Sequence, residues 1–257
     1  MATATVTAPI ETDKADAFYK RMGTLCLAMA VAGFLPSYWM PMARGTLDIP
    51  LAVHAHGALF LGWLILFRVQ AGLIGSGRTA VHRRIGFVGA IPALLMIDIV
   101  FEMQVMLVPR FDAEGFHEAA RGFAWINVSD MILFGGLIVA ALLNVRRRDV
   151  HKRLMLAATL SLMAVPIGRM ILTLGQVSRF IPQDASGPPP LEAAYLPHAL
   201  SWLLVVVAMW RDHRQSRPLH PAYITSLAAM MFQMATLAWI GRSAIWARVV
   251  DSTFLPG

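Results

Sequence analysis

The chain has few charged residues for its length. Only 14% of its 257 residues are Asp, Glu, Lys or Arg, whereas 57% are hydrophobic. A soluble domain usually carries about a quarter charged residues. The deficit falls in blocks, because long apolar runs alternate with short basic segments. This pattern excludes an ordinary soluble protein, and the short connections leave no room for a soluble domain of any size.

Cysteine and the common catalytic motifs are also scarce. Cys26 is the single cysteine, which allows neither an internal disulfide nor a cysteine-based metal cluster. The sequence contains no HExxH zinc motif, no phosphate-binding loop and no nucleophile elbow. These absences remove several frequent routes to catalysis, and the sequence does not decide whether the protein is an enzyme.

Long apolar runs are what the chain has instead, and about 20 such residues span a bilayer. The runs cover residues 22–42, 51–74, 85–108, 123–145, 154–175, 193–210 and 222–241. They predict an all-α protein, a polytopic seven-helix transmembrane bundle over residues 22–241. Residues 1–21 are then an N-terminal tail, disordered over 1–14, and residues 242–257 a C-terminal tail on the membrane surface. We expect a short surface helix within 109–122 and an irregular loop over 178–192.

The net charge of +7 could suggest binding to nucleic acid, but the basic residues lie at the ends of the apolar runs. Most of them gather on the side that holds the N-terminus. Positively charged loops remain in the cytoplasm, so we predict a cytoplasmic N-terminus and a periplasmic C-terminus in a bacterial inner membrane. The predicted partner is therefore the lipid bilayer and not nucleic acid.

The three connections on the basic side resemble one another. They read "GRTAVHRRIG", "RRRDVHKRLM" and "SRPLHPAYI", and each places a histidine just before an apolar run, at His82, His151 and His220. This similarity suggests a repeated helix hairpin. The histidines are either a cytoplasmic ligand set or proton-entry site, or interfacial caps beside the lipid headgroups.

Ionisable residues inside the predicted spans form a second pattern. A rise of 1.5 Å per residue places most of them at a depth of about 6 to 15 Å from the outer end of their spans. They are His54, His56, Asp98, Glu102, Asp130, Arg169 and His198. Such groups usually face the bundle interior and mark function, so we predict that they converge on one polar site in the outer half of the bilayer.

Spacing refines this expectation. Asp98 and Glu102 are four residues apart and share a helix face. His54 and His56 are about 200° apart around a helix, so both cannot easily point at one ion, and the sequence leaves open which faces inward. We expect Arg169 to pair with Asp130 or Glu102. The alternative to a working site is a salt-bridge network that only fixes helix packing.

Two stretches carry a resemblance to known proteins. They are "HAHGALFLGWLILFRVQAGLIGSGRTAVHRRIGFVGA" and "HKRLMLAATLSLMAVPIGR". They resemble a family of bacterial multi-pass membrane proteins of unknown function, over roughly residues 50–175, which implies a membrane placement and no activity. A looser likeness to transmembrane b-type di-haem cytochromes implies two histidine pairs. These would be His54 or His56 with His198, and His82 with His151.

Two classes of function compete on these observations. The first is a redox protein that binds haem b or a transition metal, with His56, His198 and Glu102 as metal ligands, since neutral imidazole suits such ions. The second is a proton-coupled carrier of a small solute, in which Asp98, Glu102 or Asp130 titrates and Arg169 is the counter-ion. A third option is an assembly subunit without chemistry. A small molecule or a quinone is a candidate partner, and the sequence does not define the oligomeric state.

Overall fold

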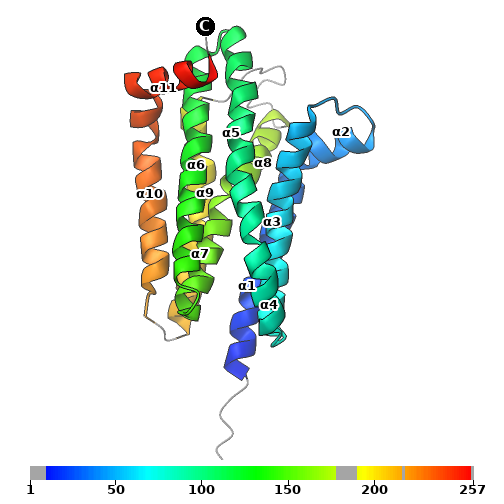
Figure 1. The fold of residues 1–257 in the computed structure, drawn as a ribbon, viewed down its shortest axis with the longest axis vertical. Helices are drawn as coiled ribbons and strands as arrows, with labels where there is room; N and C mark the ends of the chain where they lie inside the picture. The colour runs from blue at the N-terminus through cyan, green and yellow to red at the C-terminus, as the bar shows by residue number, and fades with distance from the viewer. Residues whose placement is uncertain (1–9, 178–189, 216–217, 256–257) are drawn as a thin grey trace, which may run out of the picture.

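The fold is described from a computed structural model of the chain, covering residues 10–177, 190–215 and 218–255, and these contain helices and no strand. Figure 1 shows an elongated bundle of long, roughly aligned helices, with the C-terminal helix α11 lying across one end. Seven helical segments within the described residues are long and apolar enough to cross a membrane. The predicted seven-helix bundle is therefore confirmed.

The helices follow the predicted runs closely and extend several of them. The first part of the chain forms α1 (Ile10–Phe34), η1 (Leu35–Trp39), α2 (Met40–Ala43), α3 (Leu51–Gly75), α4 (Thr79–Val88) and α5 (Ala90–Ala113). The second part forms α6 (His117–Leu143), α7 (Arg148–Ser161), α8 (Ala164–Val177), η2 (Leu191–Ala194), α9 (Tyr195–Arg214), α10 (Pro221–Gly241) and α11 (Ala244–Phe254).

The α7–α8 span forms the centre of the bundle. It is the most buried of the seven spans, and α7 packs against α1, α6, α9 and α10. Around it, α1 packs on α3, α3 on α5, α5 on α6, and α6 on α10, while α8 lies against α1 and α9. We call the end that carries the α3–α4, α6–α7 and α9–α10 connections the basic end, and the opposite end the α11 end.

Three spans are interrupted within their apolar length. The fifth is broken at Leu162 and Met163, between α7 and α8, shortly before Pro166. The third is broken at Gly89, and the first changes into a π-helical turn that contains Pro36. Proline lacks the backbone N–H that a helix needs, which accounts for the breaks near Pro166 and Pro36. Interrupted spans and π-turns are common at functional sites of membrane proteins.

Gly33 of α1 allows α1 and α8 to approach closely near Pro166, beside the break in the fifth span. A Cβ added to Gly33 would lie 2.5 Å from the carbonyl oxygen of Pro166, so no other residue fits there. Gly135 likewise allows α6 to approach α5, because an added Cβ would lie 3.2 Å from the Ile97 side chain.

Two expectations for the connections and tails are corrected. The segment 109–122 forms no separate surface helix, because α5 continues to Ala113 and α6 begins at His117. The predicted disordered tail is too long, since α1 begins at Ile10. The C-terminal tail does form a helix, α11, which packs against α5, α6 and α10. Most of the predicted loop over 178–192 lies outside the described residues.

Candidate functional site

Two of the predicted intramembrane residues meet inside the bundle. Asp130 of α6 and His198 of α9 are 8% and 5% exposed, and the imidazole Nε2 lies 3.0 Å from Asp130 Oδ1. His198 Nδ1 lies 2.7 Å from the carbonyl oxygen of Ala194. We call Asp130 and His198 the proton pair.

The hydrogen bonds of the proton pair determine how many protons it holds. A backbone carbonyl only accepts hydrogen bonds, so His198 Nδ1 must donate to Ala194. The short contact between Nε2 and Oδ1 then requires a proton between these two atoms, carried by the imidazole or by the carboxyl group. The pair is thus an imidazolium beside a carboxylate or a neutral imidazole beside a carboxylic acid. Both forms have zero net charge, which suits a site inside a membrane.

Two polar residues that the sequence analysis did not select complete this site. The amide Nε2 of Gln233, on α10, donates to Asp130 Oδ1 at 2.6 Å and contacts Ser129 Oγ at 3.0 Å. Ser129 in turn donates to the carbonyl oxygen of Ile126. Asp130 Oδ2 accepts no hydrogen bond from any residue that the structure describes. One carboxylate oxygen is therefore held by α9 and α10, and the other is left for a further ligand or proton.

The other charged candidates do not reach the proton pair. Asp98 and Glu102 are exposed on the outer side of α5, and Arg169 is exposed on α8. The guanidinium of Arg169 lies 5.6 Å from the centre of the Phe34 ring and forms no ion pair within the described residues. The predicted pairing of Arg169 with Asp130 or Glu102 is therefore wrong. Their similar depth in the membrane suggested that these residues converge. Asp98, Glu102 and Arg169 instead lie on helix faces that turn away from the proton pair.

The outer histidines also remain separate from His198. His54 Nδ1 hydrogen bonds to the Tyr38 hydroxyl at 2.7 Å. The ring of His56 stacks on Phe60 at 4.5 Å, and its buried Nδ1 has no partner within the described residues. Their helix, α3, does not pack closely against α9. The structure thus does not assemble the outer haem pair that the cytochrome likeness implies.

The three histidines at the basic end have separate local roles. His151 Nδ1 donates to the carbonyl oxygen of Ala141 at 2.8 Å, joining α7 to α6. His220 begins α10 as its N-cap, and its Nδ1 accepts from the N–H of Ala222. His82 accepts a hydrogen bond from Gln70 through its backbone carbonyl. Across the described residues no group of three or more His, Cys, Asp or Glu side chains could hold a metal ion, so His56, His198 and Glu102 do not form the predicted ligand set.

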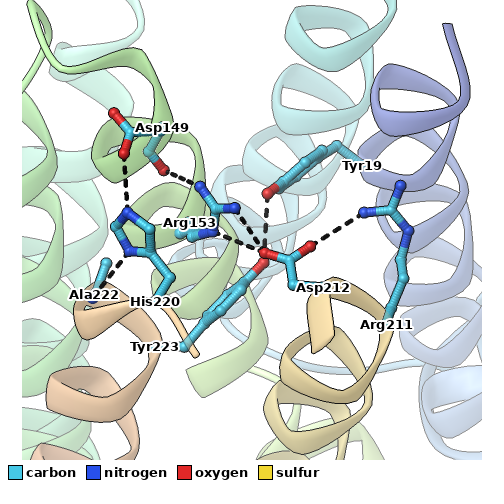
Figure 2. A network of polar contacts seen from close by, with 8 residues as sticks. All are labelled: Tyr19, Asp149, Arg153, Arg211, Asp212, His220, Ala222 and Tyr223. Atoms are coloured by element: carbon cyan, nitrogen blue, oxygen red, sulfur yellow. Dashed lines mark hydrogen bonds and ion pairs between the residues drawn. The ribbon is translucent and has the colours of Figure 1, made fainter. Parts of the chain in front are cut away.

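A second polar cluster lies at the basic end and was missed from the sequence. Figure 2 shows Arg153 of α7 beside Asp212 of α9. Both side chains are nearly fully buried, at 4% and 2% exposed. The guanidinium Nε and Nη2 donate to Asp212 Oδ2 at 2.9 and 2.6 Å, and Nη1 donates to the carbonyl oxygen of Asp149 at 2.7 Å. Arg211 adds a longer contact to Asp212 Oδ1 at 3.3 Å.

Aromatic and histidine side chains extend this cluster to two more helices. The hydroxyl groups of Tyr19, on α1, and Tyr223, on α10, lie 3.3 Å apart, and the Arg153 guanidinium lies 5.7 Å from the centre of the Tyr223 ring. His220 Nε2 donates to Asp149 at 2.9 Å, since its Nδ1 is already an acceptor. We call Tyr19, Asp149, Arg153, Asp212, His220 and Tyr223 the basic-end cluster. It joins α1, α7, α9 and α10 (Figure 2).

The fold and these two clusters define a multi-pass membrane protein with buried ionisable groups at two heights. Along α9 the proton pair and the basic-end cluster are 14 residues apart, or about 21 Å, and the buried residues Val205 and Ala208 separate them. Comparisons with protein-family models, with curated proteins and with solved structures find no match to the chain.

Proposed function

We propose that the protein is a proton-coupled carrier of the bacterial inner membrane, with its N-terminus in the cytoplasm, in which the proton pair holds the exchangeable proton. The observation that carries the proposal is the hydrogen bond between Asp130 Oδ1 and His198 Nε2. Because the carbonyl of Ala194 fixes the proton on Nδ1, the pair can gain or lose a proton only at His198 Nε2 or at the Asp130 carboxylate, the two groups that join α6 to α9. Protonation would therefore change the contact between two spans.

The interrupted fifth span supports this function. Discontinuous spans line the substrate and ion sites of many carriers, and the movement of one half against its neighbours provides access to alternate sides. Here α8 approaches α9 beside the proton pair, since a Cβ added to Gly168 would lie 3.4 Å from the ring of Pro197. A change in the protonation of His198 would thus occur next to α8, the half-helix that the break separates from α7.

A redox function with bound haem or metal is the second candidate, and the geometry favours it less. Both ring nitrogens of His198 already have protein partners, so binding iron or copper would require the loss of one of them. The remaining support is the buried Nδ1 of His56, which lacks a partner among the described residues. The resemblance to bacterial multi-pass membrane proteins agrees with either candidate, since it implies no activity.

The test uses the purified protein in liposomes under a pH gradient, acidic outside. A mixture of amino acids, sugars and carboxylic acids is offered, and the liposome contents are compared by mass spectrometry with and without the gradient. We expect at least one solute to accumulate only with the gradient, and Asp130→Asn to abolish that dependence. The matched control is Glu114→Gln, at an exposed ion pair with Arg110. Failure of every solute to respond, or a haem absorption band in the purified protein, would contradict the proposal.

A further inference from the structure

Glu102 and Arg169, like Asp98, face outward from the membrane-spanning part of the bundle and have no carboxylate–guanidinium partner among the described residues. Glu102, on α5, lies among exposed apolar side chains that include Phe101 and Val105. Arg169, on α8, lies beside the exposed Val165. Charges facing lipid are unfavourable and normally pair with another group. Within the described residues neither forms an ion pair, so each lacks a counter-charge among those residues.

The height of Glu102 follows from the packing of α5 on α6. Ile97 lies opposite Gly135, because a Cβ added to that glycine would be 3.2 Å from the Ile97 side chain. The two helices run antiparallel, since a turn of three residues joins them. Glu102 is five residues beyond Ile97, and Asp130 is five residues before Gly135, about 7.5 Å in each case. Glu102 therefore lies at the height of Asp130.

The height of Arg169 follows from the packing of α8 on α9. Gly168 lies beside the ring of Pro197, and the next residue, His198, hydrogen bonds to Asp130. One residue along a helix rises about 1.5 Å. Arg169 therefore also lies at the height of Asp130, within about one helical turn. The unpaired carboxylate and the unpaired guanidinium are at the same level of the bundle.

Equal height is what a contact between two copies of this chain requires. All copies enter a membrane with the same orientation, so a group on one copy meets a group on the next only at the same depth. The two groups also lie on different sides of the bundle. The helices that pack against α5 include α3 and α6, and α8 lies against α1 and α9. A contact that uses both faces is therefore head to tail.

We propose that copies of this chain assemble head to tail in the membrane, with Glu102 of one copy paired to Arg169 of a second copy. Asp98, one turn away on the same exposed face of α5, is the second carboxylate within reach of that guanidinium. The apolar neighbours of each group would pack together around the ion pair. Head-to-tail contacts close into a ring or continue as a chain, so the assembly contains an acidic α5 face and a basic α8 face in every contact.

The experiment is cysteine cross-linking in native membranes, in a Cys26→Ala background. Two chains are co-expressed, one with Phe101→Cys beside Glu102 and one with Val165→Cys beside Arg169. We expect an oxidised dimer from the mixture and none from either variant alone. The control replaces the first variant by Phe232→Cys on α10. Phe232 is 71% exposed, and its neighbour Gln233 hydrogen bonds to Asp130, so the control cysteine lies at a similar height in the membrane. Cross-links from Phe101→Cys alone, equal yields with the control, or no cross-link at all would overturn the proposal.

The charges are tested on the same pair of chains. Adding Glu102→Arg to the Phe101→Cys chain places two arginines opposite each other. We expect this to lower the affinity between the two copies, and with it the yield of the mixed dimer, about tenfold. Adding Arg169→Glu to the Val165→Cys chain should then restore it. If the arginine variant does not accumulate in membranes, Glu102→Gln together with Asp98→Asn replaces it, and an unchanged yield with this neutral double variant would contradict the ion pair. Transport is not measured, so the result is independent of the proposed carrier function.

Discussion

The basic-end cluster and the proton pair both bury charged side chains between helices, but their chemistry differs. Arginine does not lose its proton in proteins, so Arg153 and Asp212 form a permanent ion pair held by several hydrogen bonds. Asp130 and His198 share one proton that either group can carry. The Arg153–Asp212 pair can therefore only be intact or broken, whereas the proton pair has forms that differ in where the proton lies.

The two clusters therefore have different roles at the two ends of the bundle. The basic-end cluster joins α1, α7, α9 and α10 (Figure 2) and contributes a fixed connection. The proton pair joins α6 to α9, with α10 attached through Gln233, and lies near α8, the second half of the interrupted fifth span. The bundle thus combines a permanent ion pair between helices at the basic end with a protonatable site nearer the α11 end, an arrangement that agrees with the proposed carrier function.

The largest effect is expected from Arg153→Met. The substitution leaves the Asp212 carboxylate buried without its main partner, and breaking a buried pair in this way costs about 3–5 kcal/mol. Combining it with Asp212→Leu should recover most of the loss, because apolar side chains often replace a buried pair well. Thermal unfolding of the detergent-purified protein measures both variants, with Arg148→Met, at an exposed arginine, as control. A single variant as stable as this control would show that the cluster is not a fixed connection.

A smaller effect is expected from Asp130→Ala. This change leaves His198 Nε2 and the Gln233 amide without their shared acceptor, and a buried polar group without a partner costs about 1–3 kcal/mol. The asparagine amide of Asp130→Asn still offers an oxygen acceptor for Gln233 and an N–H donor for an unprotonated Nε2 of His198, so we expect it to retain most of the stability while losing the exchangeable proton. The same unfolding assay applies. An asparagine variant as unstable as the alanine variant would mean that the pair serves mainly to hold the helices together.

The smallest effect is expected at Arg121→Met. Arg121 on α6 donates to Asp251 on α11 through two bonds of 2.8 and 2.9 Å, but the two side chains are 27% and 42% exposed. Exposed ion pairs contribute about 0.2–1 kcal/mol and are screened by salt. Hydrogen exchange of α11 should rise in the variant, and in the wild type at high salt. An effect as large as that of Arg153→Met would remove the distinction between buried and exposed pairs.

The sequence predicted the seven spans well because span length and apolar composition are local properties. It also selected Asp130 and His198, since ionisable residues deep in an apolar run are conspicuous. It did not reveal which helix face turns inward, so Arg169, Asp98 and Glu102 were wrongly expected to join them. Helix rotation depends on packing with neighbours that a single sequence does not specify.

The basic-end cluster was missed for a related reason. Arg153 and Asp212 lie close to the ends of their spans, where charges are ordinary, and Arg153 looked like one more basic residue of a cytoplasmic loop. Only the arrangement of α7 and α9 shows that the two are buried together. Gln233 and Tyr223 were overlooked because uncharged polar residues are common in membrane spans, and the signal that they share one buried face of α10 lies in their ten-residue spacing.

The most direct test of the shared proton is nitrogen NMR of ¹⁵N-histidine-labelled protein in lipid, with His198 assigned by its loss in His198→Gln. From about pH 5 to about pH 8, the range in which free histidine titrates, we predict that Nδ1 stays protonated. We also predict that the Nε2 signal shows a hydrogen-bonded proton that Asp130→Asn removes at the upper end of the range. An Nε2 signal that is the same in wild type and Asp130→Asn, or an unprotonated Nδ1, would contradict the account.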